Sequence, residues 1–360
     1  NVIKEHGADA VRWYMIANSQ PWDNLKFDVG GVVETKQKLF STIYNVYSFF
    51  SLYANIDGFV YREAAVSVKE RPLLDQWILS ELNSLVSMVG EHYENYEPTL
   101  SARAIQAFVI DKLSNWYVRL CRRRFWKGEY DSNKISAYQT LFECLTVVSK
   151  LSSPIAPFFM DRLFSDLNNV VKNENVTSVH LAKFPKINKK HINPGLNKKM
   201  RLTKNICSLA LSLRKKEGVR VRQPLKSITI CLSDGFVEKD VLTDLVKSEV
   251  NIKEVCFSNN STDVIEQELI VNFPVVGKKY GKKTKGIVGV VNKLGLSGVL
   301  EYEKLKKINI CVDGGLTLDR SGLMKQAAEE YDKLDMGPVT GLNMGSTGQE
   351  STIEPIDDKD

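Results

Sequence analysis

Apolar positions recur every three or four residues through the first half of the chain, a spacing that predicts helices. Prolines mark the breaks between these segments, because a helix seldom continues through the residue before a proline. Helices are expected at 1–18, 29–54, 73–93, 101–126, 136–151 and 158–167. Long helices joined by short turns indicate an antiparallel bundle. Asp9 is expected to cap the first helix at Ala10, and Asp131 to cap the fifth.

The pattern changes in the second half of the chain. A basic, Asn-rich linker at 185–195 precedes one more amphipathic helix, 196–217, and the domain boundary is placed in this linker. Beyond it the apolar period becomes two, which predicts strands at 227–232, 255–258, 269–273 and 307–312, with helices at 237–249 and 324–334. The fold class is therefore mainly α, a helical bundle followed by a smaller α+β domain. Residues 336–360 are expected to form a mobile tail.

Composition places the chain among soluble globular proteins. Of its 360 residues, 43% are apolar and 26% charged, and no apolar run reaches the 18 residues that suggest a membrane span. The first residues show no secretory signal, so a cytoplasmic location is expected. The chain starts at Asn1 without a methionine, which suggests a fragment of a longer protein.

Positive charge is concentrated in two stretches. Residues 185–225 hold twelve Lys and Arg against one acid, and 278–285 (KKYGKKTK) hold five lysines and no acid. Such clustering favours contact with nucleic acid, although solvated lysine-rich loops remain the alternative.

No pattern of catalytic or metal-binding residues is present. The chain lacks a phosphate-binding loop, a dinucleotide fingerprint, a nucleophile motif and any closely spaced Cys or His pair. The six cysteines are therefore expected to be reduced core or half-core residues, and no catalytic residue, metal ligand or cofactor site is predicted. Asp313-Gly314-Gly315 is interpreted as a hairpin turn.

The segment 111–130 carries the clearest recognition pattern. On a helix at 100° per residue its apolar side holds Val109, Leu113, Trp116, Tyr117 and Leu120. A separate side holds Asn115, Arg119, Arg122, Arg123 and Trp126, with Lys127 at its edge. Basic side chains at this spacing can contact successive phosphates, and Trp126 is either a base-stacking residue or a core aromatic.

Two further predictions concern the same helix. Trp116 is expected in the core. Arg124 projects towards the apolar side, so a buried ion pair or a role at the helix end is expected for it rather than contact with nucleic acid.

A second basic segment follows at 219–225, VRVRQPL. If it were a strand, Arg220, Arg222 and Pro224 would share one face, and Lys215 and Lys216 directly precede it. Together these residues form a second candidate nucleic-acid surface. The competing interpretation is an exposed edge strand protected by charge.

Five motifs occur in an order that resembles class I aminoacyl-tRNA synthetases, and within them the isoleucyl branch. They are GADAVRWYMI (7–16), LSNWYVRLCRRRFW (113–126), LSSPIAPFFMDRLF (151–164), SVHLAKFP (178–185) and VRVRQPL (219–225). The resemblance covers about residues 1–289, and RRRFW with VRVRQPL favours isoleucyl over valyl, leucyl and methionyl relatives. The region after Val290 resembles nothing closely enough to receive a role.

The resemblance implies four segments. Residues 1–25 would end the catalytic and stem-contact region, 26–185 would form the helical anticodon-binding bundle, 186–335 an appended domain, and 336–360 a tail. The ATP-binding motifs and the editing domain of the family are absent, so the fragment alone is expected to be inactive, with ATP and Mg²⁺ required only by a full-length isoleucine–tRNA ligase. The cysteine-rich C-terminal zinc site of some bacterial members is also not matched.

The function implied is recognition of the anticodon arm of tRNA(Ile) by a protein that is expected to be monomeric. The residues expected to contact tRNA are Arg119, Arg122, Arg123, Trp126, Lys127, Lys215, Lys216, Arg220 and Arg222. Alternatives are the anticodon-binding region of a valyl or other class I synthetase and a helical protein-interaction module. An independent enzyme is disfavoured because the catalytic motifs are missing.

Overall fold

The computed structural model describes residues 2–127, 129–172, 174–232, 237, 241–258, 267–271, 273–291, 293, 307–310, 316–319, 323–327 and 339–345. The chain divides into two compact units, Asn1–Asn197 and Lys198–Asp360. The division falls inside helix α10 (Pro194–Lys216) rather than in the linker before it. The reason is that the linker is attached to the first unit: the backbone amides of Asn188 and Asn193 donate to the side chains of Asn83 and Ser80 at 2.8 Å each.

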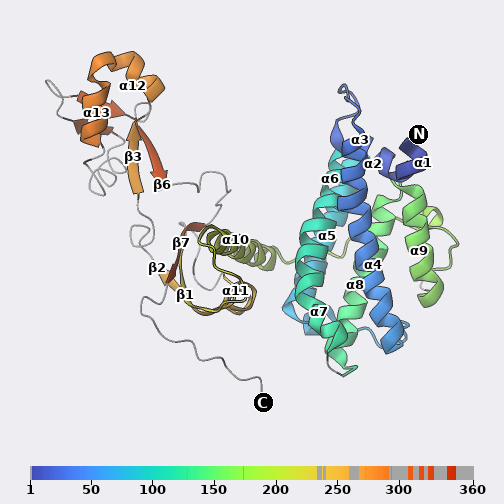
Figure 1. Ribbon diagram of the computed structural model, residues 1–360. Helices are drawn as coiled ribbons and strands as arrows, with labels where there is room; N and C mark the ends of the chain where they lie inside the picture. The colour runs from blue at the N-terminus through green and yellow to red at the C-terminus, as the bar shows by residue number, and fades with distance from the viewer. Residues whose placement is uncertain are drawn as a thin grey trace. The chain divides into compact units, whose positions relative to one another are not determined.

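The first unit is a bundle whose long helices run alongside one another (Figure 1). Its α-helices are α1 (Val2–His6), α2 (Ala8–Asn18), α3 (Val29–Thr35), α4 (Ser41–Asp57), α5 (Leu73–Glu94), α6 (Pro98–Ala107), α7 (Arg119–Trp126), α8 (Ser132–Ser152) and α9 (Pro157–Val171). Two π-helical segments, η1 (Lys36–Phe40) and η3 (Phe108–Val118), make α3–α4 and α6–α7 continuous. Short 3₁₀ turns lie at Val68–Glu70, Val179–Leu181 and Lys189–His191.

The helix starts follow from local side chains, with one correction. Asp131 caps α8 as predicted, accepting from the backbone amide of Lys134 at 2.8 Å. Asp9 does not cap its own helix, because α2 already begins at Ala8 after a break at Gly7, whose φ is 87°. Asp9 instead accepts from the amide of Phe159 at 2.7 Å, so it supplies a cap to the first turn of α9.

The core of the bundle lies between α5, η3 and α8. Helix α5 packs against α6, η3 and α8, and buries Trp77, Ile78, Leu82, Leu85, Val86 and Val89. An aromatic cluster closes one part of this core: Phe125 and Phe59 lie against Tyr138 with ring centroids 5.0 and 4.9 Å away. Burial of these apolar surfaces is the main force that holds the helices together.

The π-helical segment shifts which residues reach the core. Most buried positions in this stretch recur every four residues, namely Val109, Leu113, Tyr117, Cys121 and Phe125, with Phe108 and Val118 buried beside them. A π-helical turn holds more residues than an α-helical turn, so the 100° spacing used on the sequence drifts out of phase. Trp116 and Leu120, both assigned to the apolar side, are therefore only half-buried.

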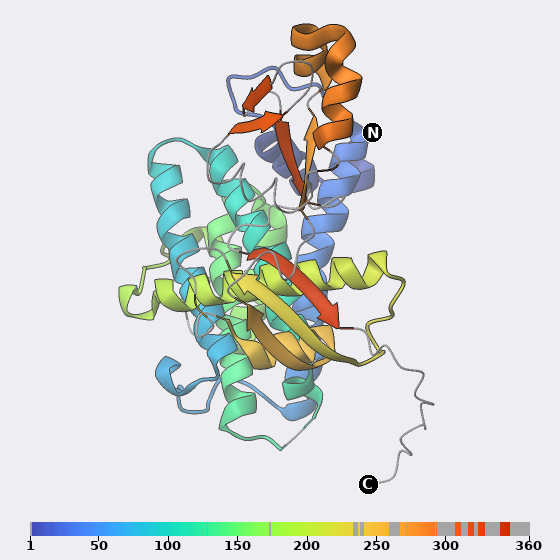
Figure 2. The same cartoon turned by 90° about the vertical axis from the view of Figure 1, so that its left-hand side faces the viewer.

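The second unit contains a small mixed sheet beside α10. Strand β1 (Leu225–Leu232) pairs in parallel with β2 (Ile252–Ser258), with α11 (Thr243–Val250) between them in sequence, and antiparallel with β7 (Val339–Gly345). Figure 2 shows these strands together next to α10. Two strand pairs follow: β3 (Gln267–Val271) with β6 (Leu323–Ala327), and β4 (Lys307–Ile310) with β5 (Leu316–Asp319).

Parts of the second unit differ from the sequence-based expectations. Residues 323–327 form strand β6 rather than the start of a helix, because pairing with β3 outweighs their helical pattern. Residues 339–345 of the expected tail form β7. The helix expected from 237 begins at Thr243, and the lysine-rich stretch runs from α12 (Phe273–Tyr280) through the 3₁₀ turn Gly281–Lys283 into α13 (Thr284–Val291). The turn at 313–315, residues 328–334 and the tail after 345 fall outside the described residues.

Candidate nucleic-acid interface

The C-terminal part of the helix formed by α6, η3 and α7 presents a basic surface. Arg119, Arg122 and Arg123 are exposed on α7, and Lys127 is exposed directly after it. The side chain of Trp126 is 57% exposed, so it lies at the surface and not in the core. We call these five residues the α7 basic face.

The opposite side of α7 is fixed by a buried ion pair. The guanidinium of Arg124 donates to both carboxylate oxygens of Asp75 on α5, at 2.6 and 2.8 Å. Arg124 is 16% exposed and Asp75 is 0% exposed, which confirms the ion pair expected from the sequence. Tyr117 and Ser136 also donate to Asp75, at 2.8 and 3.1 Å. Burial would lower the pKa of Arg124, but its hydrogen bonds to Asp75 and the charge of that carboxylate raise it above its usual value.

Aromatic rings lie beneath two of the exposed arginines. The guanidinium carbon of Arg122 is 5.9 Å from the ring centre of Phe49 on α4. That of Arg119 is 5.5 Å from the ring of Trp116, and its Nε donates to the carbonyl of Asn115 at 2.8 Å. These contacts limit the side-chain rotamers and orient the charges before any ligand arrives.

Sequence reasoning missed Phe49 and Asp75. The signal for Asp75 was present, because an acid stands at a core position of α5 between Leu74 and Trp77. A charge at such a position requires a partner, and the partner could have been sought among the inward-pointing arginines.

The second unit carries the other predicted contact residues. Lys215 and Lys216 are exposed at the end of α10, and Arg220 and Arg222 are exposed in the segment that follows. These four residues and the α7 basic face belong to different units, so the structure brings each group together separately.

Residues 219–224 form a loop instead of the strand that the alternation suggested. Arg214, only 1% exposed, donates to the carbonyls of Arg220, Gln223 and Asn251 at 2.9, 3.0 and 3.0 Å. The side chain of Asn251 donates to the carbonyls of Val221 and Arg222, both at 3.0 Å. Arg214 and Asn251 thus bind the carbonyls of residues 220–223 on the inner side of the loop. The backbone turns there, and the side chains of Arg220 and Arg222 remain exposed to solvent. An edge strand protected by charge is excluded for the same reason.

Other chemistry is not supported in the part of the chain that the structure describes. No three His, Cys, Asp or Glu side chains gather there to hold a metal ion, and no described helix is long and apolar enough to cross a membrane. Four of the five described cysteines are buried, whereas Cys256 is exposed, contrary to expectation. Burial raises the pKa of the Cys121 thiol to about 12, which makes it a poor nucleophile.

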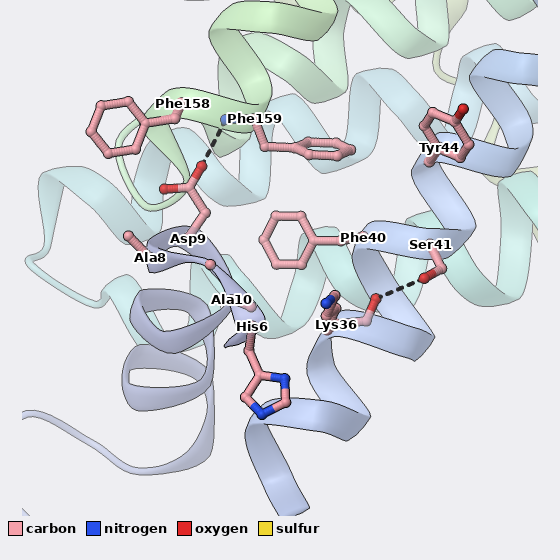
Figure 3. A pocket seen from close by; sticks show the side chains of 11 residues that line it. His6, Ala8, Asp9, Ala10, Lys36, Phe40, Ser41, Tyr44, Phe158 and Phe159 are labelled. Atoms are coloured by element: carbon pink, nitrogen blue, oxygen red, sulfur yellow. Dashed lines mark hydrogen bonds between the residues drawn. The ribbon is translucent and has the colours of Figure 1, made fainter. Parts of the chain in front are cut away.

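A cavity of about 500 Å³ lies in the first unit between α2, α4 and α9. Figure 3 shows the rings of Phe40, Phe158 and Phe159 around it and the Asp9 carboxylate turned to the amide of Phe159. The same carboxylate also forms an ion pair with Arg12 at 2.7 Å, so both of its oxygens take part in contacts that stabilise the fold.

Comparison with known proteins shows which protein family this part of the chain matches. Residues 75–230 match the model of the anticodon-binding domain of tRNA ligases. That range contains the α7 basic face, the Asp75–Arg124 ion pair and the 219–224 loop. The part of the bundle from Asp75 onward, with the start of the second unit, thus matches the anticodon-binding domain of tRNA ligases.

Full-length relatives narrow the assignment. Isoleucine–tRNA ligase of Bacteroides fragilis is 47% identical over 316 residues, which cover 87% of this chain and 28% of the relative. The enzyme of Cytophaga hutchinsonii is 48% identical, and the match covers 84% of this chain and 27% of the relative. The enzyme of Clostridium tetani is 38% identical, and the match covers 78% of this chain and 27% of the relative. The chain belongs to the isoleucyl-tRNA synthetase family, of whose members it spans little more than a quarter.

A solved structure is similar at a greater distance. The ternary complex of a leucyl-tRNA synthetase from Agrobacterium radiobacter K84 aligns with 71% of this chain and 28% of that chain, at 14% identity and a TM-score of 0.38. A similarity at that level carries no argument about the present chain.

Proposed function

We propose that this chain binds the anticodon arm of tRNA(Ile) on behalf of an isoleucine–tRNA ligase. The observation that supports the proposal best is the α7 basic face. Three arginines, a lysine and an exposed tryptophan share one surface, on a helix whose other side is anchored by the Asp75–Arg124 ion pair. Arginines that contact phosphates supply affinity, and an aromatic ring among them can stack an unpaired base of the anticodon loop.

The 219–224 loop and the end of α10 supply a second set of contacts in this proposal. Lys215, Lys216, Arg220 and Arg222 are exposed, and the loop is held by Arg214 and Asn251. A preorganised basic loop binds the backbone of a folded RNA at a lower entropic cost than a flexible one.

The chemistry of the longer protein forms part of the same proposal. ATP- and Mg²⁺-dependent isoleucylation would take place in a part of the enzyme that lies outside the present sequence, with the protein acting as a monomer in the cytoplasm. The present chain would require no cofactor of its own.

Titration of the 360-residue chain with tRNA(Ile) at two salt concentrations tests the contacts. Arg119→Ala with Arg123→Ala should weaken binding and reduce the slope of log affinity against log salt by about 2. The matched control is Lys4→Ala with Lys183→Ala, which removes the same charge from exposed positions elsewhere in the first unit. Equal slopes for the two double variants would contradict the assignment of the α7 basic face.

Variants of Trp126 distinguish the contribution of base stacking to tRNA affinity from that of charge. Trp126→Ala should lower affinity by about 1–3 kcal/mol without changing the salt slope, whereas Trp126→Phe should retain most of the binding. tRNA(Ile) with a substituted anticodon should bind more weakly than the natural tRNA. If both bind equally well, the chain recognises only the charge of the RNA.

A further inference from the structure

A second cavity lies in the first unit, at the end of the bundle where α5 begins. Its volume is about 280 Å³, and its lining includes Ser67, Lys69, Gln76, Lys190, His191 and Asn193. The residues come from the turn before α5, from α5 itself and from the Lys189–His191 turn. No acidic residue lines it.

The walls of this cavity are fixed by hydrogen bonds. Gln76 donates to the carbonyls of Lys69 and Arg71, at 3.3 and 2.7 Å, which ties the turn before α5 to the helix. Asn193 is tied to α5 through the hydroxyl of Ser80, at 2.8 Å. The site therefore does not need to be assembled when a ligand binds.

The cavity is positively charged. Lys69 and Lys190 are exposed at its rim, and within the described residues neither forms an ion pair with a carboxylate. Arg71, 5% exposed, lies close enough to His191 to act on it electrostatically. Burial and the charge of Arg71 both lower the pKa of His191, which favours the neutral form of its ring.

His191 offers a hydrogen-bond donor that nothing in the described chain accepts. The amide oxygen of Asn188 accepts from the backbone amide of Lys190 at 3.2 Å, which turns its nitrogen towards Nε2 of His191, 3.1 Å away. Nε2 is then the acceptor, and the proton of the neutral ring is on Nδ1. Nδ1 is buried and has no protein partner among the described residues. Such a donor costs free energy unless an acceptor reaches it.

The cavity and α7 both adjoin the first turn of α5. Gln76 lines the cavity and follows Asp75 in sequence, and Asp75 binds Arg124 on the side of α7 opposite the α7 basic face. The first turn of α5 thus contributes both to the cavity and to the ion pair that anchors α7.

We infer that this cavity binds a phosphate group of the RNA backbone. Lys69 and Lys190 supply the positive charge, and Nδ1 of His191 donates a hydrogen bond to a phosphate oxygen. The inference rests on the proposed function, because it takes the polyanion to be tRNA. It adds a phosphate contact through residues that were not among the predicted tRNA contacts, although Lys190 belongs to the basic stretch 185–225.

The test compares three double variants of the 360-residue chain. Lys69→Ala with Lys190→Ala should lower tRNA(Ile) affinity and reduce the salt slope by about 2. Lys69→Arg with Lys190→Arg should keep the slope of the parent chain. Lys4→Ala with Lys183→Ala is the control for net charge, because Lys183 adjoins Phe184, which packs near Gly90 towards the other end of α5. A slope for the cavity variant equal to that of this control would overturn the inference.

A second measurement separates this inference from the proposed function. Titration with inorganic phosphate, followed through the His191 ring signals in NMR spectra, should shift those signals in the parent chain and not in Lys69→Ala with Lys190→Ala. If phosphate shifts them while the tRNA slope of that variant matches the control, the cavity holds free anions only and the RNA assignment is wrong. If the parent chain does not bind tRNA at all, the proposed function fails and the assignment to RNA fails with it, whereas the phosphate titration still reports whether the cavity binds anions.

Discussion

Arg124 on α7 holds Asp75 on α5 through two parallel hydrogen bonds, of 2.6 Å to one carboxylate oxygen and 2.8 Å to the other. Arg124 also donates to the carbonyl of Asn133 at 2.7 Å, so one guanidinium joins α5, α7 and the start of α8. The three exposed arginines that precede it on α7 owe their position to this contact. Charge-assisted bidentate pairs of this kind are strong and geometrically specific.

Removing Arg124 should therefore destabilise the first unit. Arg124→Ala leaves the Asp75 carboxylate buried without its ion-pair partner, and the expected loss in the free energy of unfolding is about 3–5 kcal/mol. All five tryptophans lie in the first unit, so denaturant unfolding followed by tryptophan fluorescence reports this unit alone. Arg123→Ala, an exposed neighbour, should change stability by about 0.5 kcal/mol or less. Similar losses for both variants would show that the ion pair adds little.

Tyr96 occupies a position that favours glycine. Its φ is 59°, and it ends α5 with two hydrogen bonds, from its own amide to the carbonyl of Tyr93 and from Glu97 to that of His92. This is the Schellman arrangement, in which the residue after the helix adopts the left-handed conformation. The side chain is 86% exposed, so it gains little from packing.

Tyr96→Gly should stabilise the first unit by about 1 kcal/mol, because it removes the strain of a left-handed tyrosine. The matched control is Gly58→Ala at the end of α4, where φ is 69° and open space surrounds the position. That variant should lose about 1 kcal/mol for the same reason. Equal and opposite shifts in the denaturation midpoint are expected, and a destabilised Tyr96→Gly would mean that the ring makes contacts worth more than the strain.

The bundle could be predicted from the sequence, whereas much of the second unit could not. Periodicity located the helices because each buries one stripe, and Arg124 was recognised because it falls among apolar positions. The π-helical segment could not be anticipated from an α-helical period, so the placement of Trp116 and Leu120 was wrong. Strand β7 pairs with β1 from more than 100 positions away, a contact that local pattern does not encode. The unpaired Nδ1 donor of His191 could not be predicted either, because it arises only where two turns distant in sequence pack against α5.

Asp161 makes the stability of the first unit depend on pH. Its carboxylate accepts from the hydroxyl of Ser178 at 2.7 Å and from the amide of Val179 at 2.8 Å. The hydrogen bond from Ser178 lowers the pKa of Asp161 in the folded state, and burial opposes this only in part. A carboxyl whose pKa is lower in the folded than in the unfolded state stabilises the fold above the unfolded value of about 3.9 and loses this effect as pH falls through the folded value.

Asp161→Asn should therefore be less stable than the parent chain at pH 7, and the difference should shrink as pH falls below about 4. Urea unfolding at pH 7, 5 and 3 measures this difference. Asp23→Asn, at an exposed position in the turn after α2, is the control and should follow the parent at every pH. A difference between Asp161→Asn and the parent that is the same at pH 7 and pH 3 would show that ionisation of Asp161 does not contribute.

Arg214 links the fold of the second unit to its basic loop. Its guanidinium spans three carbonyls, those of Arg220, Gln223 and Asn251, which a lysine ammonium cannot reach together because it lacks the planar fork.

Arg214→Lys keeps every positive charge yet releases part of the 219–224 loop. Trypsin should then cleave after Arg220 or Arg222 faster than in the parent chain, with the sites mapped by mass spectrometry. tRNA(Ile) affinity should fall while the salt slope stays within about 0.5 of the parent value, since no phosphate contact loses its charge. Lys253→Arg, which exchanges one cation for another at an exposed position on β2 outside the proposed tRNA contacts, should alter neither quantity. Unchanged cleavage in Arg214→Lys would mean that Asn251 alone is sufficient to hold the loop.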